Sequence, residues 1–427
     1  MSIYRGIQCD LLTGEERVWA ISPDEPSSHV ACTVEMSNTK YRYECAVIDE
    51  IQMMSDVKRG WAWTRALLGL TCEEIHVCGE DTAIEMIQTI ADSCGDELEV
   101  LRYKRLGPLT VSPNHLGANL SNVKSGDCVV AFSQRELFTI RQKIEKTTGY
   151  KCAIVYGGLP PATRMEQAAR FNDPKDEHEI LVASDAIGMG LNLNIKRIVF
   201  KTLDKYDGYS IVQLTPSHTK QIAGRAGRFG SNHPEGEVTT LYGRDFKTLK
   251  YLLNRQSKIV QDVFLKVVQL DGYNYFMCDL ESVQYIADLI SAIPLSIWQQ
   301  YTVSQAPISQ NKPLSASVIV EFARYISTHK EITSQTLKDM MSWPPKMPKT
   351  LKGLQETETL HEICDAYLWL SYRFPETFVH QEEVRTMQRL VENVIGAAVS
   401  SNLKQRRIPR DTRQLIDETK PSNSKQD

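Results

Sequence analysis

The chain has 427 residues, of which 42% are hydrophobic and 24% are charged. This composition excludes a wholly disordered protein, because so many apolar residues can form a core. The length exceeds what one core usually serves, so we expect several domains. The net charge of −4 excludes binding to nucleic acid through overall charge, and any such surface must be a local track.

The cysteine pattern and the apolar runs indicate the class of protein. Ten cysteines are scattered without a Cys-x-x-Cys pair, which predicts reduced intracellular thiols rather than a zinc site. The chain has no apolar run long enough for a membrane span. Residues 1–16 lack an apolar signal core and are too acidic for a transit peptide. These features predict an intracellular protein.

Residues 45–255 alternate short apolar runs with helical patterns, which predicts α/β layers around a largely parallel sheet. Helices are expected between the runs, with Asp81-Thr82 capping the first and Gly149 ending the second. The helices are expected at 82–93, 134–147 and 162–171. The strands are expected at 46–48, 75–78, 128–132, 152–156, 180–183 and 197–200.

The pattern of the sequence changes at two places along the chain. Glycine and proline residues at 104–127 first predict a boundary between two α/β units. Beyond residue 246 amphipathic helices are expected, interrupted by the proline-rich segment 343–348. The polar end of the chain is expected to be disordered. The expected helices are 246–270, 281–292, 315–328 and 357–373. The resulting segments are 1–107, 108–245, 246–345, 346–403 and 404–427.

The first candidate site is Asp49-Glu50, which follows the apolar run Val47-Ile48. Carboxylates at the C-terminal end of a buried parallel strand lie where open α/β sheets bind ligands. One carboxylate can hold Mg²⁺ through water, and the other can orient the water that attacks a phosphate. A surface turn is the alternative. Asp-Glu also occurs at 24–25, 96–97, 176–177 and 417–418, but only residues 49–50 directly follow a β-branched apolar run.

The second candidate site is the string from Gln221 to Arg228. Arg225 and Arg228 are three residues apart on one side of a helix start, and small residues between them let a phosphate chain approach. The planar fork of arginine binds phosphate oxygens bidentately. A glycine-softened surface helix with solvated arginines is the alternative.

The third candidate site follows the buried run 181–183. Asp185 is followed by Gly188 and Gly190, which would free backbone N–H groups to meet ribose or phosphate. A packing turn is the alternative.

The order of these strings resembles a superfamily-two helicase. Residues 47–52 resemble its motif II of the DExH type, 78–80 motif III, 129–135 motif IV, 180–193 motif V and 221–228 motif VI. The resemblance is closer still to the mitochondrial ATP-dependent RNA helicases of the suppressor-of-var-three type. The strings that carry it are CDLLTGEER (9–17), CTVEM (32–36), AVIDEIQM (46–53), RGWAWTRALLGL (59–70), VYGGLPP (155–161), SDAIGMGLNL (184–193), IAGRAGRF (222–229), GEVTT (236–240), PLS (294–296), API (306–308) and YLWLSYRF (367–374).

This resemblance implies two RecA-like lobes, the first of them incomplete, followed by helical C-terminal domains. Residues 1–107 would be part of the ATP-binding lobe, 108–245 the second lobe, and 246–345 and 346–403 the helical domains. The resemblance implies catalytic roles for Asp49, Glu50, Arg225 and Arg228, with Asp49 holding Mg²⁺. ATP contacts are implied for Gln52, Gly188, Gly190, Gln221 and Gly224. RNA contacts are implied for Thr13, Arg17, Thr33, Ser133 and Asp185.

The resemblance also implies a biological role. The family unwinds RNA in the 3′-to-5′ direction with ATP and passes it to an exoribonuclease, such as polynucleotide phosphorylase, for RNA degradation and surveillance. The implied location is the mitochondrial matrix, with the nucleus as a second one. A non-catalytic RNA-binding or partner-docking fragment is the alternative. A DNA helicase is a lesser alternative, because motifs that track phosphates do not read the 2′-hydroxyl.

Two departures from the family pattern affect the expected activity. The chain has no Gly-Lys-Ser or Gly-Lys-Thr string, whereas the family holds ATP with a P-loop. Met1 falls downstream of that loop, so we expect an N-terminally truncated, destabilised first lobe and almost no ATPase activity. Residues 252–257 run almost directly into 263–265, where the family has a longer helical segment. Both gaps suit an alternatively spliced or mispredicted transcript.

Several aromatic and basic residues have two interpretations. Trp61 and Trp63 could stack on bases, but the surrounding leucine and alanine residues favour the core. Trp369, Tyr372 and Phe374 are expected to pack between helices. The basic segment 404–410 could bind a phosphate backbone or could keep the chain end soluble.

Overall fold

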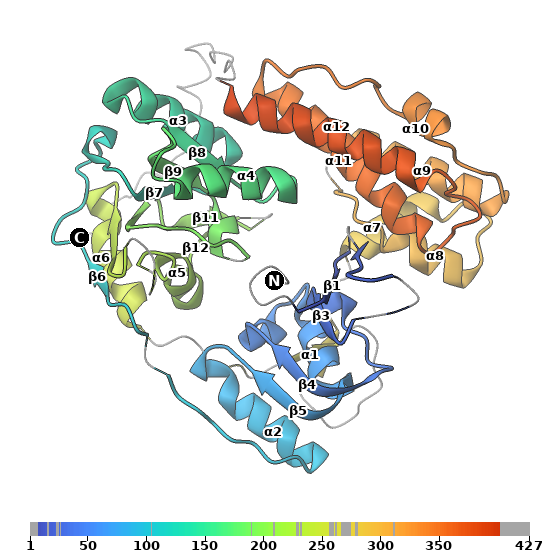
Figure 1. Ribbon diagram of the computed structural model, residues 1–427, viewed down its shortest axis with the longest axis horizontal. Coiled ribbons are helices and arrows are strands. Elements are labelled where there is room, and N and C mark those ends of the chain that lie inside the picture. The colour runs from blue at the N-terminus through green and yellow to red at the C-terminus, as the bar shows by residue number, and fades with distance from the viewer. Residues whose placement is uncertain are drawn as a thin grey trace, which may run out of the picture.

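The computed structural model of the chain describes residues 7–401, apart from short gaps. Arg228 and the tail beyond 403, which was expected to be disordered, lie outside the described residues. Figure 1 shows three groups of elements: a first lobe in blue, a second lobe in green, and C-terminal helices in orange and red. The gaps are 15–16, 23–24, 26, 104, 189, 208–209, 228–229, 231–232, 256–259, 261–262, 266–274, 278–280 and 311.

The second lobe is built on a six-stranded sheet in which every neighbouring pair of strands is parallel. The strand order is β6-β13-β10-β7-β9-β8. The strands are β6 (Leu109–Val111), β7 (Asp127–Val130), β8 (Cys152–Val155), β9 (Ile180–Ala183), β10 (Arg197–Phe200) and β13 (Gly236–Thr240). The helices are α3 (Gln134–Thr148), α4 (Pro161–Asn172), α5 (Pro216–Ala223) and α6 (Gly243–Asn254), and β11 (Asp204–Tyr206) and β12 (Ile211–Gln213) form an antiparallel pair.

Both faces of this sheet are covered, which is why its central strands are mostly apolar. Every residue of β7, β8, β9 and β10 is buried. Val129 belongs to a core shared with α3 and the C-terminal helices, whereas Val130 belongs to a core shared with α4, α5 and α6. The buried Asp127 accepts two hydrogen bonds from Arg197 on the adjacent strand, at 2.6 and 3.0 Å, so neither charge is left unpaired.

The first lobe contains β4 (Arg42–Ile48) and β5 (Thr71–Val77), which form a parallel pair, with α1 (Gly60–Gly69) and α2 (Ile84–Cys94). Trp63 is buried and Trp61 packs against the same core, which confirms the prediction for both tryptophans. The β4–β5 pair has little cover compared with the second sheet. Val47 in β4 remains 68% exposed although it belongs to an apolar run.

A small sheet precedes the first lobe, with the order β2-β1-β3. Its strands are β1 (Cys9–Leu12), β2 (Arg17–Val18) and β3 (His29–Cys32). The buried carboxylate of Asp10 accepts hydrogen bonds from the backbone N–H groups of Ala20 and Ser27, both at 2.9 Å. These bonds lower the pKa of Asp10 against the opposing effect of burial, and they tie Ala20 and Ser27 to β1.

The C-terminal helices share one core with a face of the second lobe. Phe322, Tyr367 and Phe378 lie edge to face with ring centroids 5.0–6.1 Å apart. No helix among the described residues is long and apolar enough to cross a membrane. The helices are α7 (Glu281–Ile290), α8 (Ile297–Ser304), α9 (Pro313–Ser327), α10 (Ser334–Met340), α11 (Leu351–Ser371) and α12 (Gln381–Ser400).

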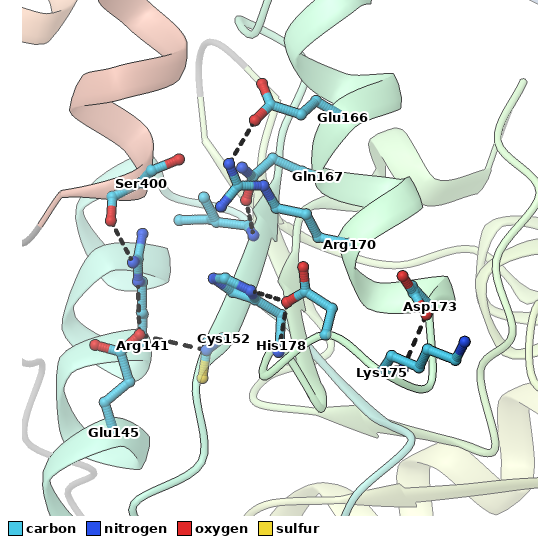
Figure 2. A network of polar contacts seen from close by, with 12 residues as sticks. Arg141, Glu145, Cys152, Glu166, Gln167, Arg170, Asp173, Lys175, His178 and Ser400 are labelled. Atoms are coloured by element: carbon cyan, nitrogen blue, oxygen red, sulfur yellow. Dashed lines mark hydrogen bonds and ion pairs between the residues drawn. The ribbon is translucent and has the colours of Figure 1, made fainter.

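Buried polar contacts join α12 to the second lobe. Figure 2 shows Arg141 of α3 between Glu145 and the end of α12. Its guanidinium pairs with Glu145 at 3.0 Å and donates to the carbonyl oxygens of Val399 and Ser400, the latter at 3.3 Å. These carbonyls lie in the last turn of α12, where helix carbonyls lack intrahelical partners. Arg141 therefore caps α12 from another part of the chain.

Three details differ from the sequence expectations. The helix expected at 246–270 is α6, which ends at Asn254, and residues 263–265 instead form β14, paired in parallel with β15 (Tyr275–Met277). Val260 reaches back into the first-lobe core and donates to the carbonyl of Thr82, so tertiary packing overrides the helical pattern. Because α6 packs in the second lobe, the boundary expected at 245 falls inside a helix. A 3₁₀ turn over Asp81–Ala83 precedes α2, so the expected cap at Asp81-Thr82 is wrong, whereas Gly149 ends α3 with φ 81° as expected.

Candidate functional site

A cleft of about 830 Å³ lies between the two lobes. Glu50 and Gln52 line it from the first lobe, and Gln221, Gly224 and Arg225 line it from the second. Folding thus brings together two groups of predicted site residues that lie far apart in the sequence. The other lining residues are Gly79, Glu80, Asp81, Thr82, Glu85, Arg102, Leu191, Leu193 and Lys220.

The two predicted acids stand directly after β4. Glu50 adopts the left-handed conformation, with φ 53° and ψ 44°, which costs energy for a residue with a Cβ atom. Its carboxylate accepts a hydrogen bond from Nε2 of Gln52 at 2.6 Å. The Asp49 carboxylate accepts from the backbone N–H of Glu50 at 2.9 Å, and the Asp49 carbonyl accepts from Trp63. Asp49 adjoins the cleft in sequence but does not line it.

Gly79 leaves room for the Gln52 side chain to reach the backbone of Glu80. The Gln52 Oε1 atom accepts a hydrogen bond from the backbone N–H of Glu80 at 3.1 Å. A Cβ atom at Gly79 would lie 2.3 Å from that same Oε1 and 2.9 Å from a methyl group of Ile51. The site therefore requires glycine after β5 for steric reasons, not for an unusual backbone angle.

The second-lobe side of the cleft is held by α5 and the turn after it. Arg225 donates through Nη2 to the carbonyl of Gly188, which ends the 3₁₀ helix Asp185–Gly188 after β9. Arg105, from the connection between the lobes, donates to the carbonyls of Ala226 and Gly227, the latter at 2.6 Å. Gly190 has φ 72°, so glycine suits the turn that follows Gly188. Gly188 and Gly190 do not line the cleft themselves.

Several residues at the cleft were missed by the sequence interpretation. Ser217 of α5 donates to the Glu80 carboxylate at 2.5 Å and so connects the two lobes. Arg102 pairs with Asp81 at 2.7 Å, and Lys220 donates to the Arg255 carbonyl at 2.7 Å. Glu80 could have been found from its place in the motif III string. Arg102, Ser217 and Lys220 stand in no string with a chemical signature.

The residues predicted to contact RNA fall into two groups. Arg17 faces Leu12 across the β1–β2 pair, and Thr33 donates its backbone N–H to the Leu12 carbonyl at 3.1 Å. Thr13 directly follows Leu12, so Thr13, Arg17 and Thr33 gather at one end of the small sheet. Ser133 and Asp185 instead follow the adjacent strands β7 and β9 of the second lobe, where Asp185 pairs with Lys205.

Four family models match successive parts of the chain. The DEXQ-box helicase domain of Suv3 matches residues 3–103, and the helicase conserved C-terminal domain matches 112–230. Suv3 C-terminal domain 1 matches residues 285–327, and the ATP-dependent RNA helicase SUV3 C-terminal domain matches 354–401. The chain belongs to the Suv3 helicase family. The Suv3 model is of the DEXQ type, in agreement with Gln52 at the position where a DExH motif has histidine.

Named relatives of the Suv3 family resemble the chain along most of its length. The mitochondrial ATP-dependent RNA helicase SUPV3L1 of Gallus gallus is 42% identical over 93% of this chain and 54% of its own. Its Homo sapiens counterpart is 41% identical over the same shares. The SUV3 homolog of Drosophila melanogaster is 40% identical over 92% of this chain and 56% of its own. The chain thus spans about half the length of the curated relatives it matches.

A solved structure of the helicase MrfA, bound to DNA and AMPPNP, resembles part of this Suv3 family chain. The TM-score is 0.40 at 16% sequence identity, and the match covers 60% of this chain and 41% of the other.

Proposed function

We propose that the chain is part of an ATP-dependent RNA helicase that unwinds RNA in the 3′-to-5′ direction. The observation that carries the proposal is the cleft, in which Glu50 and Gln52 of one lobe face Gln221 and Arg225 of the other. A site divided between two lobes can couple a nucleotide to their relative movement. The similar proteins of Gallus gallus, Homo sapiens and Drosophila melanogaster are ATP-dependent RNA helicases, which supports the same activity.

The side chains present fit a Mg²⁺–ATP complex in part. Hard carboxylate oxygens at Asp49 and Glu50 suit Mg²⁺, and Arg225 suits phosphate oxygens. ATP, when bound, would supply the free energy for unwinding. Asp49 would hold the metal ion, Glu50 would orient and deprotonate the attacking water, and Arg225 would neutralise charge on the phosphate. The hydrogen bond from Gln52 would keep the Glu50 carboxylate aimed into the cleft.

A second part of a nucleotide site, the P-loop string, is not found in the 427-residue sequence. The sequence contains no Gly-Lys-Ser or Gly-Lys-Thr string. The backbone N–H groups and lysine of a P-loop normally cradle the β- and γ-phosphates. We therefore expect the purified chain to hydrolyse ATP at close to zero rate, with or without RNA. Hydrolysis at normal helicase rates on addition of RNA would contradict this expectation.

A second candidate function applies to the chain by itself: a non-catalytic RNA-binding or partner-docking protein. The exposed β4–β5 pair and the complete, buried second sheet favour it, because only one of the two lobes is well covered. Binding of a fluorescent, non-hydrolysable ATP analogue separates the two candidates. Tight binding that is lost in Arg225→Gln supports a nucleotide-driven motor, and lack of binding with retained RNA affinity supports the non-catalytic role.

We also propose a mitochondrial location, with a role in RNA degradation beside an exoribonuclease such as polynucleotide phosphorylase. The similar helicases of Gallus gallus and Drosophila melanogaster are mitochondrial, which supports the location. Pull-down of a tagged chain from mitochondrial extract, with and without ribonuclease treatment, tests the partner. Recovery of an exoribonuclease only before RNA is digested would indicate an indirect association through RNA.

A further inference from the structure

A groove of about 490 Å³ lies where the small N-terminal sheet meets the C-terminal helices. Figure 1 shows β1 and β3 beside this group of helices. One wall comes from β2 and the residue after it, and the other comes from the end of α11 and the first half of α12. The lining residues are Arg17, Val18, Trp19, Tyr372, Gln381, Glu382, Arg385 and Arg389.

The groove carries an excess of positive charge. Three of its lining residues are arginines, and its one lining carboxylate, Glu382, is 86% exposed at the side chain and 3.6 Å from Arg385. Among the described residues, neither Arg17 nor Arg389 forms an ion pair. Burial, together with the smaller effect of the Arg17 charge, lowers the pKa of the adjacent Arg373 to about 10. Uncompensated cations gathered around one groove attract a polyanion.

Aromatic side chains hold Arg17, Arg385 and the neighbouring Arg373 in place. The Arg17 guanidinium lies over the ring of Tyr372 at 4.0 Å, and Arg373 lies over Trp369 at 3.4 Å. Arg385 donates a hydrogen bond to the Tyr372 hydroxyl group. A guanidinium that stacks on a ring keeps its N–H edge available for a phosphate and loses little freedom on binding. Trp19 in the wall offers a flat surface on which a base can stack.

We propose that this groove binds the phosphodiester backbone of single-stranded RNA, with a base against Trp19. The proposal rests on the proposed function. It extends the path of the bound RNA into this groove, beyond the RNA contacts predicted at Thr13, Arg17 and Thr33. The groove continues from the same end of the small sheet, because Arg17 belongs to both. Arg385 and Arg389 would each contact a phosphate of the RNA, while Arg17 would stay stacked on Tyr372. The negative charge of Glu382 would repel the RNA backbone.

The test is the affinity of the full 427-residue chain for a fluorescently labelled uridine 20-mer, measured by anisotropy over a range of salt concentrations. The double variant Arg385→Gln, Arg389→Gln should bind about tenfold more weakly. It should also reduce the slope of log affinity against log salt by about 1.4, since each phosphate contact to a single strand contributes about 0.7. Trp19→Ala should weaken binding without changing that slope.

Matched controls come from α9, where Arg324 pairs with Glu321 three residues earlier, as Arg385 does with Glu382. Arg324→Gln should leave affinity and slope unchanged. Glu382→Gln should tighten binding severalfold while Glu321→Gln does not, and misfolding cannot explain a gain. A double variant that binds within twofold of the wild type at an unchanged slope would overturn the proposal.

Further outcomes separate contact to the phosphodiester backbone from contact to the 2′-hydroxyl, and failure of the groove from failure of the proposed function. An equal loss with DNA of the same length supports contact to the phosphodiester backbone, whereas a loss with RNA alone overturns it in favour of the 2′-hydroxyl. If the wild-type chain does not bind RNA, the groove and the proposed function fail together. If it binds RNA but the groove variants have no effect, only the groove fails. Binding of the ATP analogue, measured separately, should be unaffected by the groove variants.

Discussion

The carboxylate of Glu50 has little freedom, because three features of the site fix it. Its backbone is left-handed, Gln52 donates to it, and Gln52 is itself held by the N–H of Glu80. This chain of contacts passes beside Gly79, where no Cβ atom fits. A strained residue persists only where its surroundings over-determine it, and such residues gather at functional sites. The geometry therefore favours a positioned acid over a surface turn at Asp49-Glu50.

We expect Gly79→Ala to displace Gln52 and to release Glu50. The new methyl group would overlap Gln52 and Ile51, so the free energy of unfolding should fall by about 1–3 kcal/mol, as for other overpacked sites. Chemical denaturation followed by tryptophan fluorescence measures the change. Gly157→Ala is the control, because a Cβ atom there meets nothing within 4 Å. Equal stabilities of the two variants would contradict the role given to Gly79.

At the scale of elements, α11 brings a partly buried carboxylate against the second lobe. Glu358 accepts hydrogen bonds from the Tyr156 hydroxyl group at 2.6 Å and from the Gln134 amide at 3.0 Å. Burial raises the pKa of Glu358 to about 7. One turn later, burial acts to lower the pKa of His361, but hydrogen bonds to Asp365 and Glu392 outweigh it and raise the pKa to about 9.

We expect Glu358 to make the chain less stable as the pH rises. Its pKa is raised in the folded chain, so its stabilising protonated form is fully present below about pH 4.5 and is lost as the pH passes 7. Glu358→Gln keeps an acceptor for both donors and cannot ionise. It should be more stable than the wild type by about 3 kcal/mol at pH 8 and nearly equal to it at pH 4.5.

Urea denaturation across this pH range measures the difference between the two proteins. The contribution of His361, which is lost as the pH rises through 9, is common to both and cancels. Glu356→Gln, on the exposed side of α11, should show no pH-dependent gain. A constant difference between wild type and Glu358→Gln from pH 4.5 to 8 would mean that Glu358 does not titrate in this range.

At the scale of the whole molecule, the two lobes differ in how well their sheets are protected. The six-stranded sheet has apolar cores on both faces, whereas β4 and β5 form an isolated pair with Val47 largely exposed. The C-terminal helices share a core with the second lobe and are joined to it by Glu358 of α11 and by Arg141 of α3. Local stability follows the number of buried contacts, so opening should start in the first lobe.

Amide hydrogen exchange measured by mass spectrometry tests this difference. We expect β4 and β5 to exchange at least about tenfold faster than β7, β9 and β10, after correction for intrinsic rates, which corresponds to about 1.4 kcal/mol of opening free energy. Peptides from α11 should match the second sheet. Uniform protection of both sheets would show that the chain opens only as a single unit.

The sequence by itself determined much of this protein, because its signals are local. The largely apolar runs of the second lobe predicted β7 to β10, since a strand buried on both faces needs few polar residues. The strings around Asp49 and Arg225 led to the family, which the family models support. Short strands such as β6 were missed, because three residues carry no periodic signal.

Only the tertiary structure decided which distant residues meet. Ser217 reaches Glu80 across the lobes, Arg141 caps α12, and Arg17 stacks on Tyr372, which had been expected only to pack between helices. Each pair is far apart in sequence, and each contact depends on how whole elements dock. Helix and strand patterns record which face of an element is buried, but not which partner covers it. For that reason the groove of arginines emerged only from the folded chain.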